Sequence, residues 1–334
     1  MSKKIIFTNG LIDLAQPRLG SKVIFKTDDF FASANRIIDP SPAVFKEGLF
    51  DKNGKWMDGW ESRRKRTSGY DFLIIKLGKP GSIDKVDVDT SHFNGNQPSM
   101  ISLEGCYSKS KNIKDLKWKT LIGKKKTKPN SHHIFNTSSK TIFTHIKFNI
   151  FPDGGVARLR LYGNLSKENN KFGNKTINLA SLLNGASVIA CNNEHFGKAE
   201  NILAPGKAKN MGDGWETRRR RDKGFDWLIL NPINGKKIDK IEISTHHFKG
   251  NFPSHCSLQA AFLSNKKSSP SIVKSSNRWK FLLHKVNLSA NKTHTFKNIL
   301  MKNDKINFIK INIFPDGGIS RFKIFFINNL RFDY

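Results

Sequence analysis

The sequence predicts an all-β protein built from two tandem antiparallel β-sandwiches. Short runs of residues alternate between apolar and polar, as in strands with one buried face, and Gly, Pro and Asn separate these runs. Four sequence blocks occur twice in the same order. Each copy is about 160 residues long, which suits one β-sandwich domain. These observations indicate a duplicated domain rather than a solenoid, whose repeats are much shorter.

The repeated blocks keep their order but not their spacing. The pairs are IDLA at 12–15 and INLA at 177–180; DGWESRRKR at 58–66 and DGWETRRRR at 213–221; DTSHFNGNQPS at 89–99 and STHHFKGNFPS at 244–254; and NIFPDGG at 149–155 and 312–318. The offset is 165 residues at the first block (177 − 12), 155 at the middle two (213 − 58) and 163 at the last (312 − 149). Length differences therefore fall between the blocks, where loops tolerate insertions.

Alternation and short apolar runs place strands at equivalent positions of the two copies. The expected strands are 70–77 and 83–89 in the first copy, and 225–230 and 238–243 in the second. The Phe-Pro-Asp-Gly-Gly segments are interpreted as hairpin turns, the first joining residues 148–150 to 157–162. Helical periodicity is weak, and its best candidates are residues 11–14 and 179–183. The lysine-rich stretches 109–128 and 266–274 are expected to be solvated loops.

We expect two domains, residues 1–165 and 166–334, joined by a linker near residues 164–174. That stretch is polar and lies between the last strand of one copy and the first block of the next. In the first copy the polar residues of three blocks, 58–66, 89–96 and 153–158, border predicted turns. A sandwich can therefore bring these blocks together at one end.

The formal net charge of +31 leaves three interpretations open. It would attract polyanions through counterion release, or steer a small anionic substrate. Alternatively it reflects an abundance of Lys, Asn, Ile and Phe, which A/T-rich codons encode. A nucleic-acid interface would interleave basic and aromatic residues. Because the lysines here cluster in expected loops, we do not expect nucleic acid as a partner.

The three cysteines, Cys106, Cys191 and Cys256, do not form a disulfide framework. This favours the reducing cytoplasm. Asn9 and Asp13 interrupt the N-terminal apolar run, so we expect neither a secretory signal nor a membrane segment.

The histidine-bearing blocks are the strongest candidates for chemistry. Asp89 and His92 follow a predicted strand and precede Gly95, so they belong to the turn at its edge, and the second copy has His247 at the same place. Histidine is the usual proton carrier near neutral pH. The adjacent pairs at 132–133 and 246–247 lack the spacing of a zinc motif, and we expect neither a metal nor a cofactor. For Trp60 and Trp215 we favour core packing.

Together the repeated blocks DGWESRRKR, DTSHFNGN and NIFPDGG and their second copies resemble the allantoicase family. The resemblance extends from residue 10 to residue 325 and includes the duplication. It implies two jelly-roll sandwiches of the galactose-binding-like type, and hydrolysis of allantoate to ureidoglycolate and urea in purine breakdown. It also implies a homo-oligomer. Ser244 stands where the first copy has Asp89, and Gln259 where it has Glu104.

Allantoate carries a carboxylate and two ureido groups on one carbon, and these groups fit the residue types of the blocks. An arginine fork would hold the carboxylate, with Arg63 or Arg64 expected in that role. His92 and Asp89 are the expected acid and base, and Asn94 and Asn96 could bind the ureido groups. The complete set of catalytic candidates is His92, Asp89, Glu61, His247 and Glu216. The complete set of substrate-binding candidates is Arg63, Arg64, Asn94, Asn96, Arg158, Arg218, Arg219, Asn251 and Arg321.

A different class of function is also consistent with this sequence. A β-sandwich of this type can be a non-catalytic module that binds carbohydrate or another anionic ligand. Carbohydrate binding favours exposed aromatic residues on loops, whereas Arg and His dominate the repeated blocks. We therefore place the enzyme first.

Overall fold

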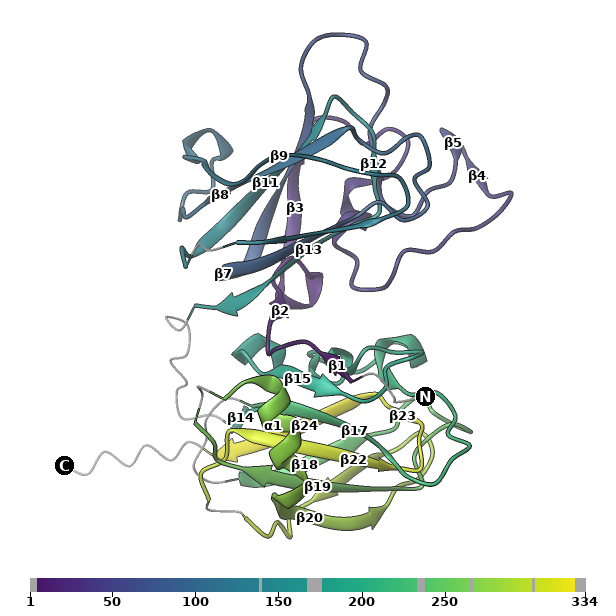
Figure 1. Ribbon diagram of the computed structural model, residues 1–334, viewed down its shortest axis with the longest axis vertical. Helices are drawn as coiled ribbons and strands as arrows, with labels where there is room; N and C mark the ends of the chain where they lie inside the picture. The colour runs from purple at the N-terminus through teal and green to yellow at the C-terminus, as the bar shows by residue number, and fades with distance from the viewer. Residues whose placement is uncertain are drawn as a thin grey trace, which may run out of the picture. The chain divides into compact units, whose positions relative to one another are not determined.

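The computed structural model describes residues 5–137, 140–166, 176–232, 238–264, 267–301 and 304–327. The chain divides into two compact units, residues 12–167 and residues 1–11 with 168–334 (Figure 1). Each unit is a β-sandwich, so the predicted tandem β-sandwich fold is confirmed. The last strand of the first copy ends at Leu165, while most of the expected linker, from residue 167 onward, lies outside the described residues.

The first unit is organised around one long strand, β7 (Asp71–Asp89). Its first half pairs with β3 (Lys22–Lys26) and β11 (Phe143–Phe151), and its second half with β10 (His132–Asn136) and β13 (Arg158–Leu165). One layer continues from β11 to β8 (Met100–Cys106) and β9 (Lys119–Lys126), and the other ends at β2 (Ile12–Asp13). The strands expected at 70–77 and 83–89 are thus one strand that runs through both layers.

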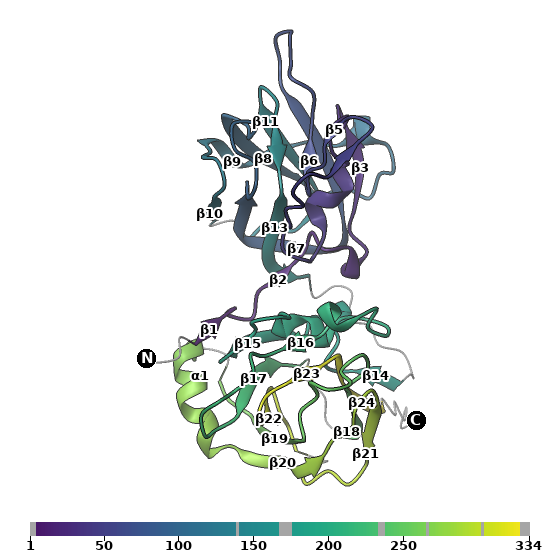
Figure 2. The same ribbon diagram turned by 90° about the vertical axis from the view of Figure 1, so that its right-hand side faces the viewer.

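The described strands of the second unit repeat this arrangement in two sheets, and residues 233–237 lie outside the described residues (Figure 2). One contains β1 (Ile6–Phe7), β15 (Ser187–Cys191), β17 (Asp226–Asn231), β22 (Phe308–Phe314), β19 (His255–Ala261) and β20 (Lys280–Asn287). The other contains β14 (Thr176–Asn178), β24 (Arg321–Ile327), β18 (Ile238–Ser244) and β21 (Thr293–Phe296). Because β1 pairs with β15, the first eleven residues belong to this unit and not to the first.

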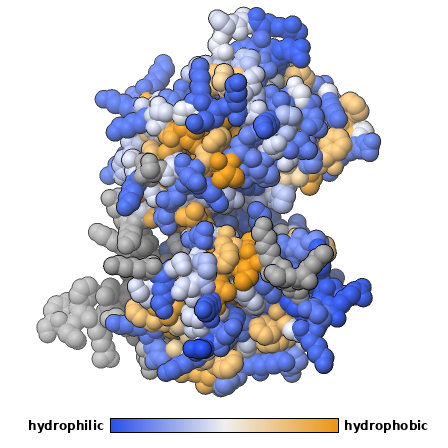
Figure 3. Space-filling view, viewed as in Figure 1, coloured by the Kyte–Doolittle hydropathy of each residue, from blue (hydrophilic) through white to orange (hydrophobic). Residues whose placement is uncertain are grey.

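Small elements complete the two units. The short strand pairs are β4 (Phe50–Asp51) with β5 (Gly54–Lys55), β6 (Trp60–Glu61) with β12 (Gly155–Val156), and β16 (Trp215–Glu216) with β23 (Gly318–Ile319). The helix α1 spans Ser269–Ser275, and the 3-10 helices are Pro17–Leu19, Ala34–Ile38, Ile113–Asp115, Leu182–Asn184, Ala199–Leu203, Met211–Asp213 and Ser276–Arg278. None of the helices in the described ranges is long and apolar enough to cross a membrane. Hydrophilic residues cover much of the face drawn in Figure 3.

Several local predictions are wrong. The strands on either side of Phe-Pro-Asp-Gly-Gly do not form a hairpin, because β11 pairs with the first half of β7 and β13 with its second half. The segment therefore crosses from one layer to the other. Residues 119–126 form β9 at a sheet edge, and residues 269–274 lie in α1, although both stretches were expected to be loops. Residues 12–13 form a strand rather than part of a helix, and residues 182–184 form only a single 3-10 turn.

The tryptophans of the DGW blocks are core residues, as predicted. Trp60 and Trp215 are completely buried. The Nε1–H of Trp60 donates to the carbonyl of Asp28 at 2.7 Å, and that of Trp215 donates to the carbonyl of Asn193 at 2.7 Å. A buried indole needs such a partner for its only polar atom. These contacts fix the start of each basic run against the sandwich.

Candidate functional site

The three polar blocks of the first copy meet at one end of the sandwich, as predicted. Glu61 pairs with Gly155 in the short β6–β12 ladder. The N–H of Gly155 donates to the carbonyl of Asn96 at 2.7 Å, and the N–H of Lys65 donates to Asp153 Oδ2 at 2.7 Å. The Phe-Pro-Asp-Gly-Gly segment therefore holds the other two blocks in place.

Two glycines allow this close approach. Gly154 has φ of 133°, and a Cβ there would lie 2.6 Å from the backbone nitrogen of Pro98. A Cβ on Gly155 would lie 2.0 Å from the ring of Phe93, which is completely buried beneath it. Only glycine fits both positions. The second copy repeats the arrangement with Gly317, Gly318 and Phe248.

His92 has a left-handed backbone conformation that is uncommon for a residue with a side chain. Its φ is 69°, and that of His247 in the second copy is 73°. The N–H of His92 donates to Asn130 Oδ1 at 3.0 Å, and that of His247 donates to Asn291 Oδ1 at 2.9 Å. A strained residue that the surrounding structure holds in place is a candidate for function.

The histidine rings also have matching contacts. Nε2 of His92 lies 3.4 Å from the carbonyl of Ala43, and Nε2 of His247 lies 2.9 Å from that of Ala208. A carbonyl accepts only from a protonated nitrogen, so this contact favours the tautomer with the proton on Nε2. In that tautomer Nδ1 carries the lone pair that can accept a proton. Phe45 stacks on the His92 ring at 5.8 Å between centroids.

Glu61 lies beside this histidine-bearing loop. Its Oε1 accepts a hydrogen bond from Asn96 Nδ2 at 2.8 Å. Burial raises the pKa of the Glu61 carboxyl, although the bond from Asn96 opposes this shift. A carboxyl group with a raised pKa is suited to donating a proton near neutral pH. Glu216 and Asn251 form the same hydrogen-bonded pair in the second copy.

A cavity of about 280 Å³ lies next to His92. Its lining residues are Phe45, Lys55, Met57, His92, Asn94 and Asn96. Of the candidates from the sequence, it brings together His92, Asn94 and Asn96, and Asn96 links it to Glu61.

Three of the lining residues come from a loop that we call the excursion, residues 44–57. Lys55 Nζ lies 4.7 Å from the centre of the Phe45 ring, and the N–H of Val44 donates to Asp58 Oδ2 at 2.9 Å. Arg36 supports the base of the loop by donating to the carbonyl of Met57 at 2.6 Å. Sequence analysis missed Phe45, Lys55 and Met57. The sequence did contain a signal for this loop, namely the drop from 165 to 155 in the offset between equivalent blocks of the two copies. The drop arises because 14 residues separate Ala43 from Asp58, but only four separate Ala208 from Asp213.

The basic run makes mostly local contacts. Arg63 Nε donates to Asp28 Oδ2 at 2.7 Å, and its guanidinium lies 5.2 Å from the centre of the Phe30 ring. Arg218 approaches His195 Nδ1 at 3.3 Å. Arg64 and Arg219 are exposed. None of these four arginines lines the cavity described above.

Arg158 and Arg321 have structural contacts instead of the expected open ones. Arg158 is buried, and all five of its N–H groups have acceptors: the carboxylate of Asp58 and the carbonyls of Ser41, Pro42, Asp58 and Ala157. Arg321 is held in the same way, by Asp213 and five carbonyls. With every donor occupied, neither guanidinium has an N–H left for a substrate.

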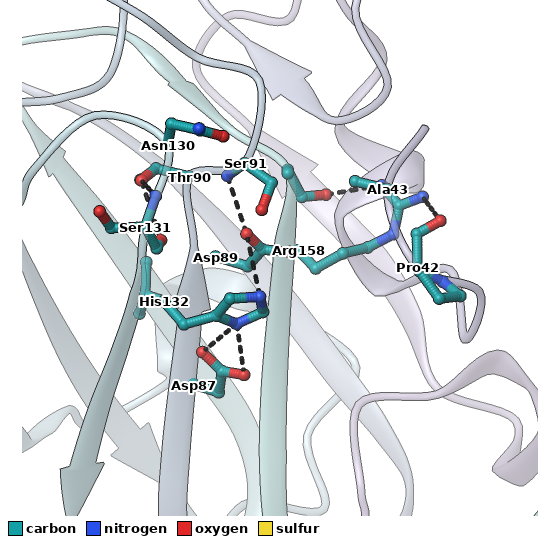
Figure 4. Close-up of polar contacts among 12 residues, drawn as sticks. Pro42, Ala43, Asp87, Asp89, Thr90, Ser91, Asn130, Ser131, His132 and Arg158 are labelled. Carbon is teal, nitrogen blue, oxygen red and sulfur yellow. Dashed lines mark hydrogen bonds and ion pairs between the residues drawn. The ribbon is translucent and has the colours of Figure 1, made fainter. Parts of the chain in front are cut away.

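Asp89 lies with His132 rather than with His92 (Figure 4). Its Oδ1 accepts from the N–H of Ser91 at 2.8 Å and is 3.7 Å from His132 Nε2. The other ring nitrogen, Nδ1, lies 3.0 Å from Asp87 Oδ2. Burial raises the pKa of Asp87, and the His132 contact opposes this shift. Asp89, expected as an acid or base beside His92, thus belongs to a cluster on β7 and β10 and does not line the cavity beside His92.

Among the residues that the structure describes, no group of three or more His, Cys, Asp or Glu side chains is arranged to hold a metal ion. All three cysteines are free and buried. The polar groups around the cavity beside His92 are the amine of Lys55, the imidazole of His92 and the amides of Asn94 and Asn96, and Asn96 connects them to the carboxyl group of Glu61.

An imidazole, an ammonium group and, through Asn96, a carboxyl group beside one cavity are features typical of enzymes that act on small molecules. Residues 12–166 and 177–327 both match the allantoicase repeat. The chain is 45% identical over 316 residues to a probable allantoicase of Acinetobacter baylyi, covering 95% of this chain and 94% of the other. It is 48% identical over 315 residues to one of Pseudomonas fluorescens, covering 94% and 95%.

Solved structures agree with these matches. The crystal structure of allantoicase from Saccharomyces cerevisiae superposes with a TM-score of 0.79 at 31% identity, covering 95% of this chain and 93% of that one. A second allantoicase structure gives a TM-score of 0.80 at 32% identity, covering 96% and 94%. The chain belongs to the allantoicase family of hydrolases, as its repeated blocks implied.

Proposed function

We propose that the chain hydrolyses allantoate to ureidoglycolate and urea, and that the reaction takes place in the cavity beside His92. The observation that carries this proposal is the cavity wall itself. It joins a histidine in a strained, doubly anchored conformation to Lys55 and, through Asn96, to a carboxyl group with a raised pKa.

The reaction makes three demands on such a site. One C–N bond to the central carbon breaks and a C–O bond from water forms, so water loses a proton and the leaving nitrogen gains one. The carboxylate beside that carbon must be held in place. The two ureido groups must be oriented by hydrogen bonds, so that only one of them leaves.

Each demand has a matching group in the first copy. Lys55 supplies the cation for the carboxylate. His92 accepts the proton of water at Nδ1, because its contact with Ala43 favours the proton on Nε2. Glu61 donates to the leaving nitrogen, since burial favours its protonated form. Asn94 and Asn96 bind the ureido groups, and the hydrogen bond from Asn96 orients Glu61.

The other candidates take supporting roles in this proposal. Arg158 stabilises the loop that carries the Ala43 carbonyl, and Arg321 does the same for Ala208. Asp89 forms the turn after β7 through its bond to Ser91. Arg63 and Arg64 lie outside the cavity wall, so we assign the carboxylate to Lys55 in their place. In the second copy, Glu216, His247 and Asn251 preserve the architecture without the excursion, and Arg218 and Arg219 are the exposed counterparts of Arg63 and Arg64.

We also propose that each copy is one domain, that the enzyme is a cytoplasmic homo-oligomer, and that it binds neither nucleic acid nor membrane. Support for the cytoplasm comes from the three free, buried cysteines, which need no oxidising compartment. Lysines 124–126 belong to the edge strand β9 and not to a groove with stacked aromatic residues.

The test is an assay of the purified chain with allantoate, in which urea and ureidoglycolate are both quantified. We expect the two products in equal amounts. Release of ammonia in place of urea, or no turnover at all, would refute the proposed reaction. A Lys55→Met variant that has normal turnover and normal KM would leave the reaction intact but refute the proposed location.

A further inference from the structure

The second unit contains a cavity at a different place from the one beside His92. Its volume is about 200 Å³, and it lies where β18, β21 and β24 meet the loop of residues 206–208. The side chains that matter here are Lys207, Ser244, His246, Thr293 and Lys323, with Glu242 in the wall. None of these residues takes part in the proposed reaction.

Equivalent positions of the first unit carry larger side chains. Thr293 pairs with Ser244 across β21 and β18 as His132 pairs with Asp89 across β10 and β7. In the first unit the His132 ring lies against the carboxylates of Asp87 and Asp89 (Figure 4). With Ser244 and Thr293 at these positions, the second unit has neither the ring nor the second carboxylate.

The same exchange changes the charge of the site. In the first unit Asp87 and Asp89 lie opposite Arg160 and Arg158 in the pairing of β7 with β13. Among the lining residues of the second unit's cavity, Glu242 supplies one carboxylate, and because Arg321 is paired with Asp213 the remaining cations are Lys323 and Lys207. A cavity with one acid and two such cations attracts an anion.

Of the cationic side chains around this cavity, the lysines and not Arg321 have N–H groups available to a ligand. All five N–H groups of Arg321 are engaged by Asp213 and backbone carbonyls. Lys323 Nζ is 3.8 Å from Glu242 Oε2, which is too long for a hydrogen bond, whereas Lys240 Nζ is 2.7 Å from Glu242 Oε1. Glu242 thus already has a close partner, and the ammonium group of Lys323 keeps its donors for a ligand.

Size and charge limit the kind of anion. The cavity of about 200 Å³ is smaller than the roughly 300–1,000 Å³ of a typical ligand pocket, which favours a small ligand. The Glu242 carboxylate in the wall disfavours a ligand with two negative charges. The hydroxyl groups of Ser244 and Thr293 suit a ligand that carries a further polar group beside its charge.

We infer that the cavity between β18, β21 and β24 binds a small organic monocarboxylate, and that it is a second ligand site separate from the proposed catalytic one. The test measures binding by isothermal titration calorimetry, so it does not depend on turnover or on the proposed reaction. The probes are glycolate, the uncharged glycolamide, which has the same number of non-hydrogen atoms, and inorganic phosphate.

We expect glycolate to bind at least tenfold more tightly than glycolamide and phosphate. Lys323→Met removes the cation but keeps the side-chain stem, and it should weaken glycolate binding at least tenfold. The double variant Ser244→Asp with Thr293→His rebuilds the arrangement of the first unit and should abolish binding. Lys280→Met is the matched control, because Lys280 is exposed on β20 in the other sheet of the same unit.

The inference is wrong if Lys323→Met and the control bind glycolate equally, since binding would then occur elsewhere. Equal binding of glycolate and glycolamide would exclude recognition of charge, and tighter binding of phosphate would show that the site selects another class of anion. Circular dichroism and a thermal melt of each variant establish that it is folded. Should the double variant not fold, Lys323→Met and its control still decide the question.

Discussion

The two units share a scaffold and differ in what covers the histidine. Both keep the left-handed histidine, the asparagine that holds its N–H, and the hydrogen-bonded Glu–Asn pair. Only the first unit has the 14-residue excursion, which adds Phe45 and Lys55 beside the ring. The repeated blocks therefore preserve the position of the histidine in both units, whereas the excursion, which is not repeated, completes a pocket beside that histidine in the first unit alone.

The largest difference between the copies is expected when the histidines are replaced. His92→Asn should lower kcat by about 10²–10⁴, the usual loss for a general base. His247→Asn should leave kcat within about twofold, because that copy lacks the excursion. Asparagine tolerates positive φ better than most residues, so both variants are expected to fold. Steady-state kinetics of urea release provide the measurement, and the reverse pattern would assign catalysis to the second copy.

The next effect concerns the cation of the excursion. Lys55→Met should raise the KM for allantoate by about 10–100-fold, which corresponds to about 1.4–2.8 kcal/mol, with a smaller change in kcat. The physical reason is that a carboxylate is held in both the ground and the transition state. Arg63→Met serves as the comparison, because Arg63 is paired with Asp28 outside the cavity wall. A larger rise in KM for Arg63→Met would restore the arginine as the carboxylate ligand.

Lys147 on β11 and Lys310 on β22 occupy equivalent positions, and replacing them should change stability with opposite signs. Lys147 pairs with Glu104 at 3.3 Å, whereas Lys310 is buried where Gln259 replaces that acid. Burial lowers the pKa of Lys310 to about 8 from 10.5. At pH 7 Lys310→Met should therefore raise the free energy of unfolding by about 1–3 kcal/mol, and Lys147→Met should lower it by up to about 1 kcal/mol.

The sign of the pH dependence follows from this lowered pKa. Below pH 8 native Lys310 is charged and its burial destabilises the fold. Between pH 8 and 10.5 the native state loses this proton while the unfolded chain keeps it, so the penalty fades as pH rises. The gain from Lys310→Met, measured by urea unfolding, should thus shrink across that window. A gain that is constant from pH 7 to 10.5 would contradict the burial of a charged lysine.

The smallest effect is expected from the lysines of β9. Replacing lysines 124–126 together by glutamine should leave turnover nearly unchanged at moderate salt, because exposed charges beyond about 10 Å are screened. Lys124 contacts the Phe151 ring at 4.5 Å, so a small loss of stability is compatible with this expectation. A tenfold loss of turnover would mean that this edge strand takes part in the site.

Sequence patterns were sufficient to predict the duplication and the positions of the strands. The four blocks established the duplication, the alternating runs established the strands, and the Asp-Gly-Trp block correctly placed a tryptophan in each core. The meeting of three distant blocks also followed, because turns of a sandwich gather at its ends. These features depend on local chemistry that is written in consecutive residues.

The contacts of individual charged residues could not be predicted in the same way. Two of the five acceptors of Arg158 are the carbonyls of residues 41–42, more than a hundred positions away in the chain. Asp89 faces His132 because β10 pairs with β7, and no sequence motif predicts the register of that pairing. Nothing in the local sequence distinguishes Lys55 from the other lysines, because its segment differs from the second copy only in length.

The continuity of β7 has a consequence for how the first unit opens. One strand of 19 residues belongs to both layers. Detaching β7 breaks the pairing of both layers at once, so amide protons throughout the first unit should exchange with solvent as one cooperative group.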